Sequence, residues 1–271
     1  MTTQNENINM TKYACYLCGF SVLQNIVLHP LNVILTKKQN VYTNISFYKY
    51  TEQLIKTQNI KYLTRGMYTS ICGYSFGQMI HLFGIEYLKI NPYFQNENNN
   101  IIFAGAISDF FSCITHYPFS LISTMQITYK KEYNSNIFLQ RLYSRGGYKS
   151  LYNGFGLYAL TGSVCSGLWW FLYENFKIYS KQYTNNNILN NGLCSLSSTI
   201  VTTFLFNPFS VIVTKMQSDR NASYGKIIKN IYHKNGIKGF WTASLLNGGS
   251  YVLNDLFFSF TYEMSHKFSK I

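Results

Sequence analysis

Three glutamates in this sequence are each followed, one helical turn later, by a basic side chain. The pairs are Glu86 with Lys89, Glu174 with Lys177, and Glu263 with His266. At this spacing a carboxylate and a cation commonly form an exposed pair that stabilises a helix by about 0.2–0.5 kcal/mol. Because the pairs recur at matched intervals along the chain, we favour a single charge cluster shared by three helices. Ion pairing is the chemistry that these residues predict.

No arrangement of reactive side chains predicts an enzyme. The serine, histidine and aspartate residues form no hydrolase pattern, and the sequence has no phosphate-binding loop. The histidines His29, His81 and His116 lack the spacing of metal ligands. The pair Cys15 and Cys18 lies in an apolar segment without a second pair, so we expect neither a redox nor a metal centre there. We therefore expect no cofactor.

The composition indicates a membrane protein. Of the 271 residues, 47% are hydrophobic and only 12% are charged, about half the charged fraction of an average soluble domain. The formal net charge is +13. A basic soluble protein would suggest a nucleic-acid partner, but such proteins usually carry many charges of both signs. We therefore expect no nucleic-acid binding.

Six stretches of the sequence are nearly free of charge. As membrane-spanning helices, they would position the glutamate pairs. They cover residues 13–36, 67–85, 101–129, 154–173, 182–214 and 239–254. Each approaches or exceeds the roughly 20 residues that a helix needs to cross a bilayer. Asp109 is their only formal charge. Asp109 and Asp255 are candidate functional acids, with capping or internal hydrogen bonding as the alternative.

The basic residues are concentrated in alternate loops. The segments 37–65, 130–149 and 215–238 hold 17 of the 23 Lys and Arg residues. Positive charge collects on the side of a membrane to which loops are not translocated. These three loops should therefore share one face, and both ends of the chain should lie on the other.

The sequence contains a threefold repeat. Its clearest mark is a proline phrase, "HPLNVILTKKQ" at Pro30, "YPFSLISTMQ" at Pro118 and "NPFSVIVTKMQ" at Pro208. The three glutamates follow these prolines by 56, 56 and 55 residues. A short segment between them, such as "SYGKIIKNIYHKNG", places Ile227, Ile228 and Ile231 at helical spacing. Each repeat therefore predicts a long helix with a proline, a short amphipathic helix and a second long helix.

This layout resembles the mitochondrial carrier family over almost the whole chain. The family signature is Pro-x-[Asp/Glu]-x-x-[Lys/Arg], usually followed by a further basic residue and a Gln. The resemblance implies an all-α membrane protein with three repeats, six transmembrane helices and short matrix-side helices. It implies one carrier-like domain over 1–271, with repeats at 12–98, 99–183 and 184–271. The prolines would kink the odd-numbered helices so that they close the matrix end.

All six signature charges of the matrix end are missing here. The signature positions, acidic or basic in the family, are Asn32, Leu35, Ser120, Ser123, Ser210 and Val213. Removing one partner of a buried ion pair costs about 3–5 kcal/mol, whereas removing both can be nearly neutral. Both partners of every pair are missing here, so no unpaired charge remains at any of the six positions and the loss of the pairs is energetically tolerable.

The resemblance also assigns the other sites. It places the glutamate pairs at the cytosolic gate, with His266 at a basic position. It places substrate contacts near Gly73, Thr161, Gly162 and Tyr251, of which none is charged. Because an anion there would be poorly stabilised, we do not expect nucleotide or carboxylate transport.

Glycines near helix starts are the remaining candidate sites. In the family, backbone amides at such places bind cardiolipin phosphates, and helix N-termini bind anions generally. The candidate positions are Gly66, Gly154 and Gly225. The alternative is that these glycines only permit tight turns.

Because the six signature positions carry no charge, the leading expectation is a structural subunit without transport. It would belong to a large complex of the mitochondrial inner membrane, such as a respiratory-chain complex, with lipid, cardiolipin and other subunits as partners. The first alternative is an active carrier of a neutral or weakly polar small solute. The second is a carrier-like receptor or scaffold of the outer membrane.

Overall fold

The computed structural model describes residues 10–40, 47–58, 60–94, 96–129, 135–180, 187–218, 223–241 and 244–269, and within them every regular element is a helix. The long helices are α1 (Met10–Asn40), α3 (Met67–Ile90), α4 (Glu97–Thr128), α6 (Phe155–Ser180), α7 (Asn187–Ser218) and α9 (Ser244–Ser269). The short ones are α2 (Phe47–Gln58), α5 (Ser135–Gly146) and α8 (Tyr224–Asn235). Three 3₁₀ segments, η1 (Ile60–Thr64), η2 (Gly147–Tyr152) and η3 (Ile237–Trp241), follow the short helices. The predicted all-α fold is confirmed for the described part of the chain.

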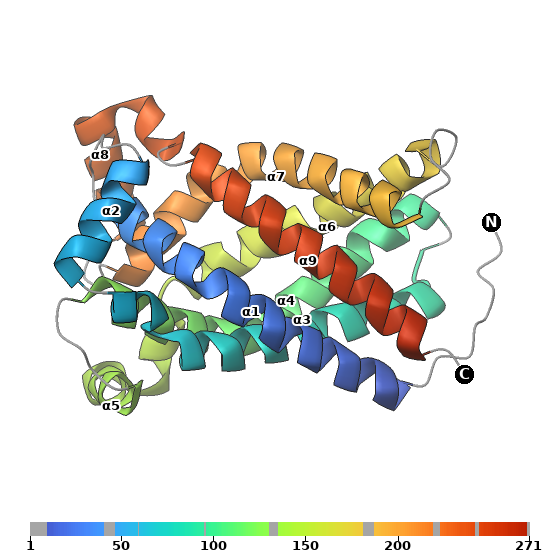
Figure 1. Cartoon of the computed structure of the whole chain (residues 1–271), viewed down its shortest axis with the longest axis horizontal. Helices are drawn as coiled ribbons and strands as arrows, with labels where there is room; N and C mark the ends of the chain where they lie inside the picture. Colours follow the sequence, from blue (N-terminus) through green and yellow to red (C-terminus); the bar gives the residue numbers. More distant parts are fainter. Residues whose placement is uncertain are drawn as a thin grey trace.

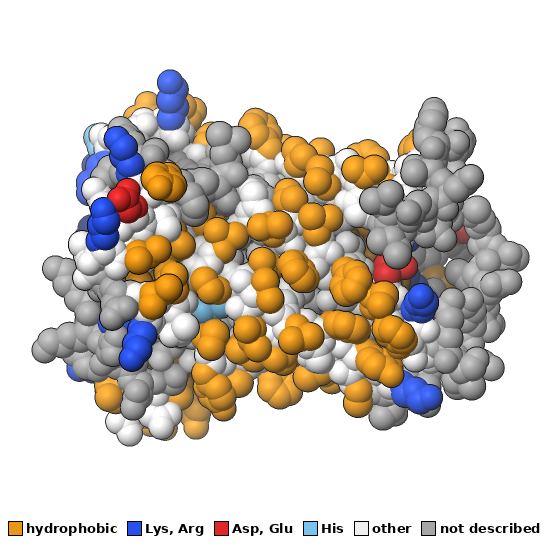
Figure 2. Space-filling model, in the orientation of Figure 1, with side chains coloured by type: hydrophobic (Ala, Val, Ile, Leu, Met, Phe, Trp, Pro, Cys, Tyr) orange, Lys and Arg blue, Asp and Glu red, His pale blue; other side chains and the backbone are white. Residues whose placement is uncertain are grey.

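The long helices form one bundle (Figure 1). Helix α1 begins and α9 ends at the same end of this bundle, which we call the terminal end. The short helices α2, α5 and α8 lie at the opposite end, which we call the surface-helix end. Figure 2 shows Lys and Arg side chains gathered toward both ends and an apolar band between them.

The apolar band suits a bilayer. The long helices expose large apolar side chains such as Leu23, Val27 and Phe204, which are 59%, 59% and 66% exposed. By length and composition alone, three of the described helices can cross a membrane, over Lys12–Lys38, Phe155–Ser180 and Asn190–Gln217. The other three predicted spans lie in α3, α4 and α9, which are 24, 32 and 26 residues long.

Each short helix packs in the same way on the proline-bearing helix of its own repeat. The residues three and four positions after each proline are buried against two side chains of the short helix. The short-helix pairs are Tyr50 and Leu54, Phe138 and Leu142, and Ile227 and Ile231. Of the isoleucines expected on the buried face of α8, Ile228 is instead 42% exposed. Because residues at i and i+4 lie on one face of a helix, each short helix packs by a single face.

Each proline lies inside a continuous helix, where it leaves the carbonyl four residues earlier without a backbone donor. In the second repeat the hydroxyl of Tyr152 donates to the Ile114 carbonyl at 3.0 Å. In the third repeat the indole N–H of Trp241 donates to the Phe204 carbonyl at 3.4 Å. In these two repeats, an aromatic residue at the end of the 3₁₀ segment therefore satisfies the carbonyl that proline frees.

The residue before each proline ties its helix to the segment that precedes the second long helix of the same repeat. The His29 ring contacts the Arg65 carbonyl at 2.9 Å through Nε2. The Tyr117 hydroxyl donates to the Asn153 carbonyl, and the Asn207 amide donates to the Phe240 carbonyl at 2.9 Å. Three different side chains thus make one equivalent contact. His29 is buried in this structural role.

The glycines predicted to bind lipid differ in backbone conformation. Gly66 and Gly154 have φ of +73° and +86°, in the left-handed region that glycine adopts most easily. Gly225 lies in the first turn of α8, and a Cβ there would have nothing within 4 Å. Gly66 and Gly154 therefore lie in tight turns and Gly225 does not, while lipid binding at the three positions stays a prediction.

We expect Gly154→Ala to destabilise the protein and Gly225→Ala to leave its stability unchanged or slightly raised. A left-handed conformation costs a non-glycine residue about 1–2 kcal/mol, and the new Cβ would lie 3.0 Å from the Tyr117 hydroxyl. Thermal unfolding of both variants in detergent measures the difference. Equal unfolding midpoints would contradict this account of Gly154.

Candidate functional site

A central cavity of about 580 Å³ lies among the six long helices. Of the positions predicted to contact substrate, Thr161, Gly162 and Tyr251 line it. Gly73 does not, because α3 turns it toward α4, where a Cβ would lie 2.3 Å from the Phe119 Cβ. Tyr74, Gly77 and Gln78 of α3 line the cavity in its place.

Both candidate acids face this cavity. Asp109 of α4 accepts a hydrogen bond from the Cys113 thiol at 3.4 Å, and its Oδ1 lies 3.7 Å from Nδ1 of His81. Asp255 of α9 accepts a hydrogen bond from the Thr199 hydroxyl at 2.5 Å. Both acids were predicted from the sequence, but their partners were not. His81 and Thr199 lie on other helices, and Cys113 lies one turn away on the same helix as Asp109.

The signature positions make neutral contacts. Four of them hydrogen-bond, as Asn32 with Ser250 at 2.9 Å, Ser120 with Gln217 at 3.4 Å, Ser123 with the Gly66 carbonyl at 3.2 Å, and Ser210 with Tyr251 at 2.9 Å. Leu35 and Val213 are buried side chains at the edge of the cavity. No ion pair joins these six positions in the described structure.

Two residues next to the signatures join the repeats at the surface-helix end. Lys37 of α1 donates to the Ile127 and Thr128 carbonyls at 3.3 and 3.1 Å, at the C-terminus of α4. A cation there is favoured by the helix dipole. Gln217 of α7 accepts a hydrogen bond from Thr124 of α4 at 3.1 Å. This end is therefore held by a cation on carbonyls and by neutral hydrogen bonds.

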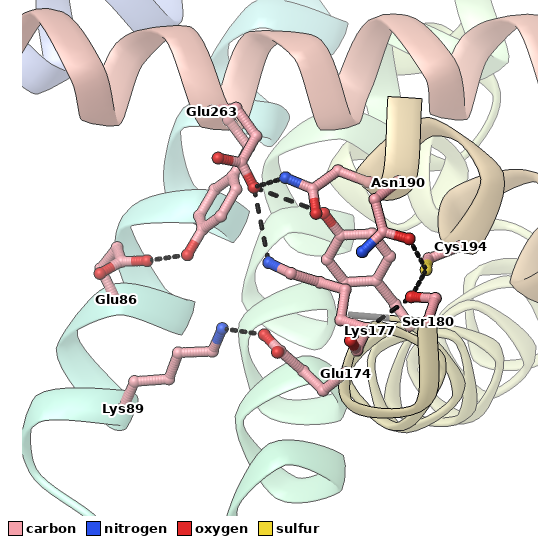
Figure 3. A network of polar contacts seen from close by, with 11 residues as sticks. Glu86, Lys89, Glu174, Lys177, Ser180, Asn190, Cys194 and Glu263 are labelled. Atoms are coloured by element: carbon pink, nitrogen blue, oxygen red, sulfur yellow. Dashed lines mark hydrogen bonds and ion pairs between the residues drawn. The ribbon is translucent and has the colours of Figure 1, made fainter. Parts of the chain in front are cut away.

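Charged pairs between repeats cross the terminal end (Figure 3). The Lys89 ammonium of α3 lies 2.8 Å from the Glu174 carboxylate of α6. The Lys177 ammonium of α6 lies 3.5 Å from the Glu263 carboxylate of α9. Glu86 of α3 instead accepts a hydrogen bond from the Tyr262 hydroxyl. We call these residues, excluding Tyr262, the glutamate ring.

The glutamate ring connects its helices in sequence, from α3 to α6 and from α6 to α9. Its pairs therefore differ from pairs along one helix, which the sequence left as the alternative. Glu263 also accepts a hydrogen bond from the Asn191 amide of α7 at 2.8 Å. The side chain of His266 lies outside the described part of the structure, so its predicted role stays a prediction.

An aromatic layer adjoins the glutamate ring. Trp169, Trp170, Tyr173 and Tyr262 belong to one buried cluster, and the Trp170 and Tyr262 rings lie 5.6 Å apart. The Lys89 ammonium lies 4.7 Å from the Trp170 ring centroid. Trp169 and Trp170 also line the cavity, so this layer lies between the cavity and the ring.

Comparisons with known proteins agree with the geometry. The family described as "Mitochondrial carrier protein" matches residues 95–184 and again residues 184–270. "Mitochondrial substrate carrier family protein J" of Dictyostelium discoideum is 25% identical over 316 residues, covering 94% of this chain and 91% of that protein. An uncharacterized mitochondrial carrier of Schizosaccharomyces pombe is 24% identical over 254 residues, covering 86% of this chain and 89% of that protein.

Proposed function

Because the chain belongs to the mitochondrial carrier family, we propose that it moves a small solute without net negative charge across the mitochondrial inner membrane. Membership of the family places it in a mitochondrial membrane. The observation that carries the proposal is a cavity of about 580 Å³, together with the glutamate ring, whose ion pairs join different repeats at the terminal end. The name of the Dictyostelium relative, a substrate carrier, supports it.

A carrier needs a binding site and a closure that can open. The glutamate ring suits this requirement because its pairs join different helices and are partly exposed. The side chains of Lys89 and Glu174 are 26% and 24% exposed, so water can replace their contact when the helices separate. The cavity volume lies within the range of small-molecule sites, about 300–1,000 Å³.

The charge of the cavity decides the class of solute. Among the described residues that line it, none is Lys or Arg, and two are aspartates. A nucleotide or a dicarboxylate would leave its charge uncompensated in a site of low polarity. This supports the expectation that such anions are not substrates.

The structural role expected from the sequence is the second candidate. It is favoured by the surface-helix end, where the six signature positions carry no ion pair in the described structure. A subunit of a complex needs the fold but no alternating closure. For either role we propose cardiolipin as a partner at Gly66, Gly154 and Gly225, which lie at the N-terminal ends of α3, α6 and α8.

Uptake into liposomes distinguishes the two candidates. We expect the purified chain to take up at least one of glycine, 1,4-butanediol and 1,4-diaminobutane saturably, and to take up neither ADP nor succinate. Protein-free liposomes are the control. Absence of all uptake, together with migration of the native protein in a very large complex in mild detergent, would replace the carrier with the subunit. Saturable ADP or succinate uptake would contradict the proposed class of solute.

A further inference from the structure

We infer that Asp109 and Asp255 form a cation site in the central cavity, and that the solute is an organic cation with a primary ammonium or guanidinium group. The inference names the substrate class of the proposed carrier and rests on that function for transport. Binding alone tests the site. It begins from the two carboxylates and from the polar atoms of the cavity that lack partners.

Asp109 has no cationic partner in the described structure, although His81 is near it. The indole N–H of Trp170 donates to Nε2 of His81 at 3.3 Å. A nitrogen that accepts this bond carries no proton, so the imidazole is neutral, with its proton on Nδ1. At 3.7 Å the Nδ1 of His81 is beyond hydrogen-bond distance of the Asp109 carboxylate, so His81 does not neutralise it.

Asp109 is also open to a ligand. The facing residue on α6 is Gly162, where a Cβ would lie 2.9 Å from Oδ2 of Asp109. Any larger residue would crowd this carboxylate oxygen. The glycine keeps the oxygen accessible from the cavity that both residues line.

Asp255 has only neutral donors around it in the described structure. Thr199 donates to its Oδ2, and the Thr199 hydroxyl in turn accepts a bond from the Trp169 indole at 3.0 Å. No described Lys or Arg forms an ion pair with Asp255. Asp255, Asp109 and Cys165 of α6 all line the same cavity.

A third acceptor faces the same cavity independently of the two acids. Gln78 is 5% exposed, and its Oε1 has no hydrogen-bond partner in the described structure. Its amide nitrogen donates to Gln24 at 3.4 Å, which leaves the oxygen for another donor. An unpaired buried acceptor costs about 1–3 kcal/mol. Together with Gln78, the two carboxylates require a ligand that donates several hydrogen bonds.

The chemistry of these groups selects a cation. Uncompensated carboxylates in a cavity are costly, and a bound cation offsets that cost through charge-assisted hydrogen bonds. Trp169, Trp170 and Phe258 also line the cavity, and aromatic faces attract organic cations. An ammonium or guanidinium group brings both the donors and the positive charge that these acceptors favour, whereas a diol of the same length brings donors without charge.

Binding to the full-length protein in detergent tests the inference with three four-carbon probes. We expect 1,4-diaminobutane to raise the thermal unfolding midpoint and to change the fluorescence of Trp169 and Trp170. The isosteric 1,4-butanediol and succinate should bind at least tenfold more weakly. Equal stabilisation by the diol would overturn the inference. Stabilisation by NaCl at the same concentration would do so too, because an inorganic cation would then be sufficient.

Matched variants locate the site. Asp109→Asn and Asp255→Asn keep the shape of each side chain and should each weaken diamine binding at least tenfold. Glu52→Gln removes a carboxylate from the exposed pair with Lys56 on α2 and should not change it. If an aspartate variant fails to fold, Gly162→Ala crowds Asp109 without removing charge and should also weaken binding. Unchanged affinity in the folded variants would overturn the inference.

Transport separates this inference from the proposed function. Diamine binding that depends on both aspartates, without any uptake, would retain the site and reject the carrier. Saturable uptake of a neutral solute that persists in the Asp109→Asn/Asp255→Asn double variant would retain the carrier and reject the cation site.

Discussion

Replacing Glu174 by lysine should lower the free energy of unfolding by about 3 kcal/mol, because it breaks a partly buried pair and leaves like charges together. The new ammonium would face Lys89, which now lies 2.8 Å from the Glu174 carboxylate, and would also lie one helical turn from Lys177. Thermal unfolding in detergent measures the loss. Once a substrate is identified, its uptake by the Glu174→Lys variant should also be lower than that of the unchanged protein.

Two controls define this prediction. The double variant Lys89→Glu/Glu174→Lys should recover much of the loss, incompletely because Lys177 still faces a lysine. Glu52→Lys reverses a charge in the Glu52–Lys56 pair, whose side chains are 46% and 72% exposed, and should change stability by at most about 0.5 kcal/mol. Equal effects of Glu174→Lys and Glu52→Lys would show that the glutamate ring is no stronger than a surface ion pair.

The second large effect is expected where α4 and α6 meet backbone to backbone. A Cβ at Gly167 would lie 2.8 Å from the Ile102 carbonyl, and one at Gly105 would lie 3.1 Å from the Gly167 Cα. Small residues allow such close approach of helices in membranes. Gly167→Leu should therefore destabilise the fold by about 3 kcal/mol or more, because a backbone atom cannot rotate away as a side chain can.

Gly156 provides the matched control on the same helix. A Cβ there has nothing within 4 Å, so Gly156→Leu should leave the unfolding midpoint unchanged or raise it slightly through helix propensity. The measurement is the yield of monodisperse protein and its unfolding midpoint for both variants. Comparable yields and midpoints would mean that α4 and α6 can separate at this crossing without cost.

The helices and their threefold register could be predicted from the sequence alone. Apolar length, helical spacing and the positions of Pro30, Pro118 and Pro208 are local properties, so they predict elements without knowledge of packing. The resemblance to the mitochondrial carrier family came from the same register, and the family match confirms it. The absence of charge at the six signature positions was also readable directly.

Contacts between helices could not be predicted from the sequence, because they follow from the packing of the bundle. Sequence reasoning named Asp109 and His81 separately, because they lie on α4 and α3 and nothing local relates them. Likewise, Tyr152 and Trp241 reach the carbonyls freed by Pro118 and Pro208 from 3₁₀ segments more than thirty positions away. Such contacts depend on the tilt of each helix, which the packing of the whole bundle sets.

The rotation of each helix about its own axis could not be predicted from the sequence either. The predicted contact position Gly73 faces Phe119 of α4, whereas Gly77 and Gln78 of the same helix face the cavity. Successive residues of a helix differ in direction by about 100°, so a small rotation exchanges cavity-lining and packing positions. That rotation is set by the close approach of α3 and α4 at Gly73. The rotation therefore depends on the contact between α3 and α4 and cannot be read from the residues of one helix alone.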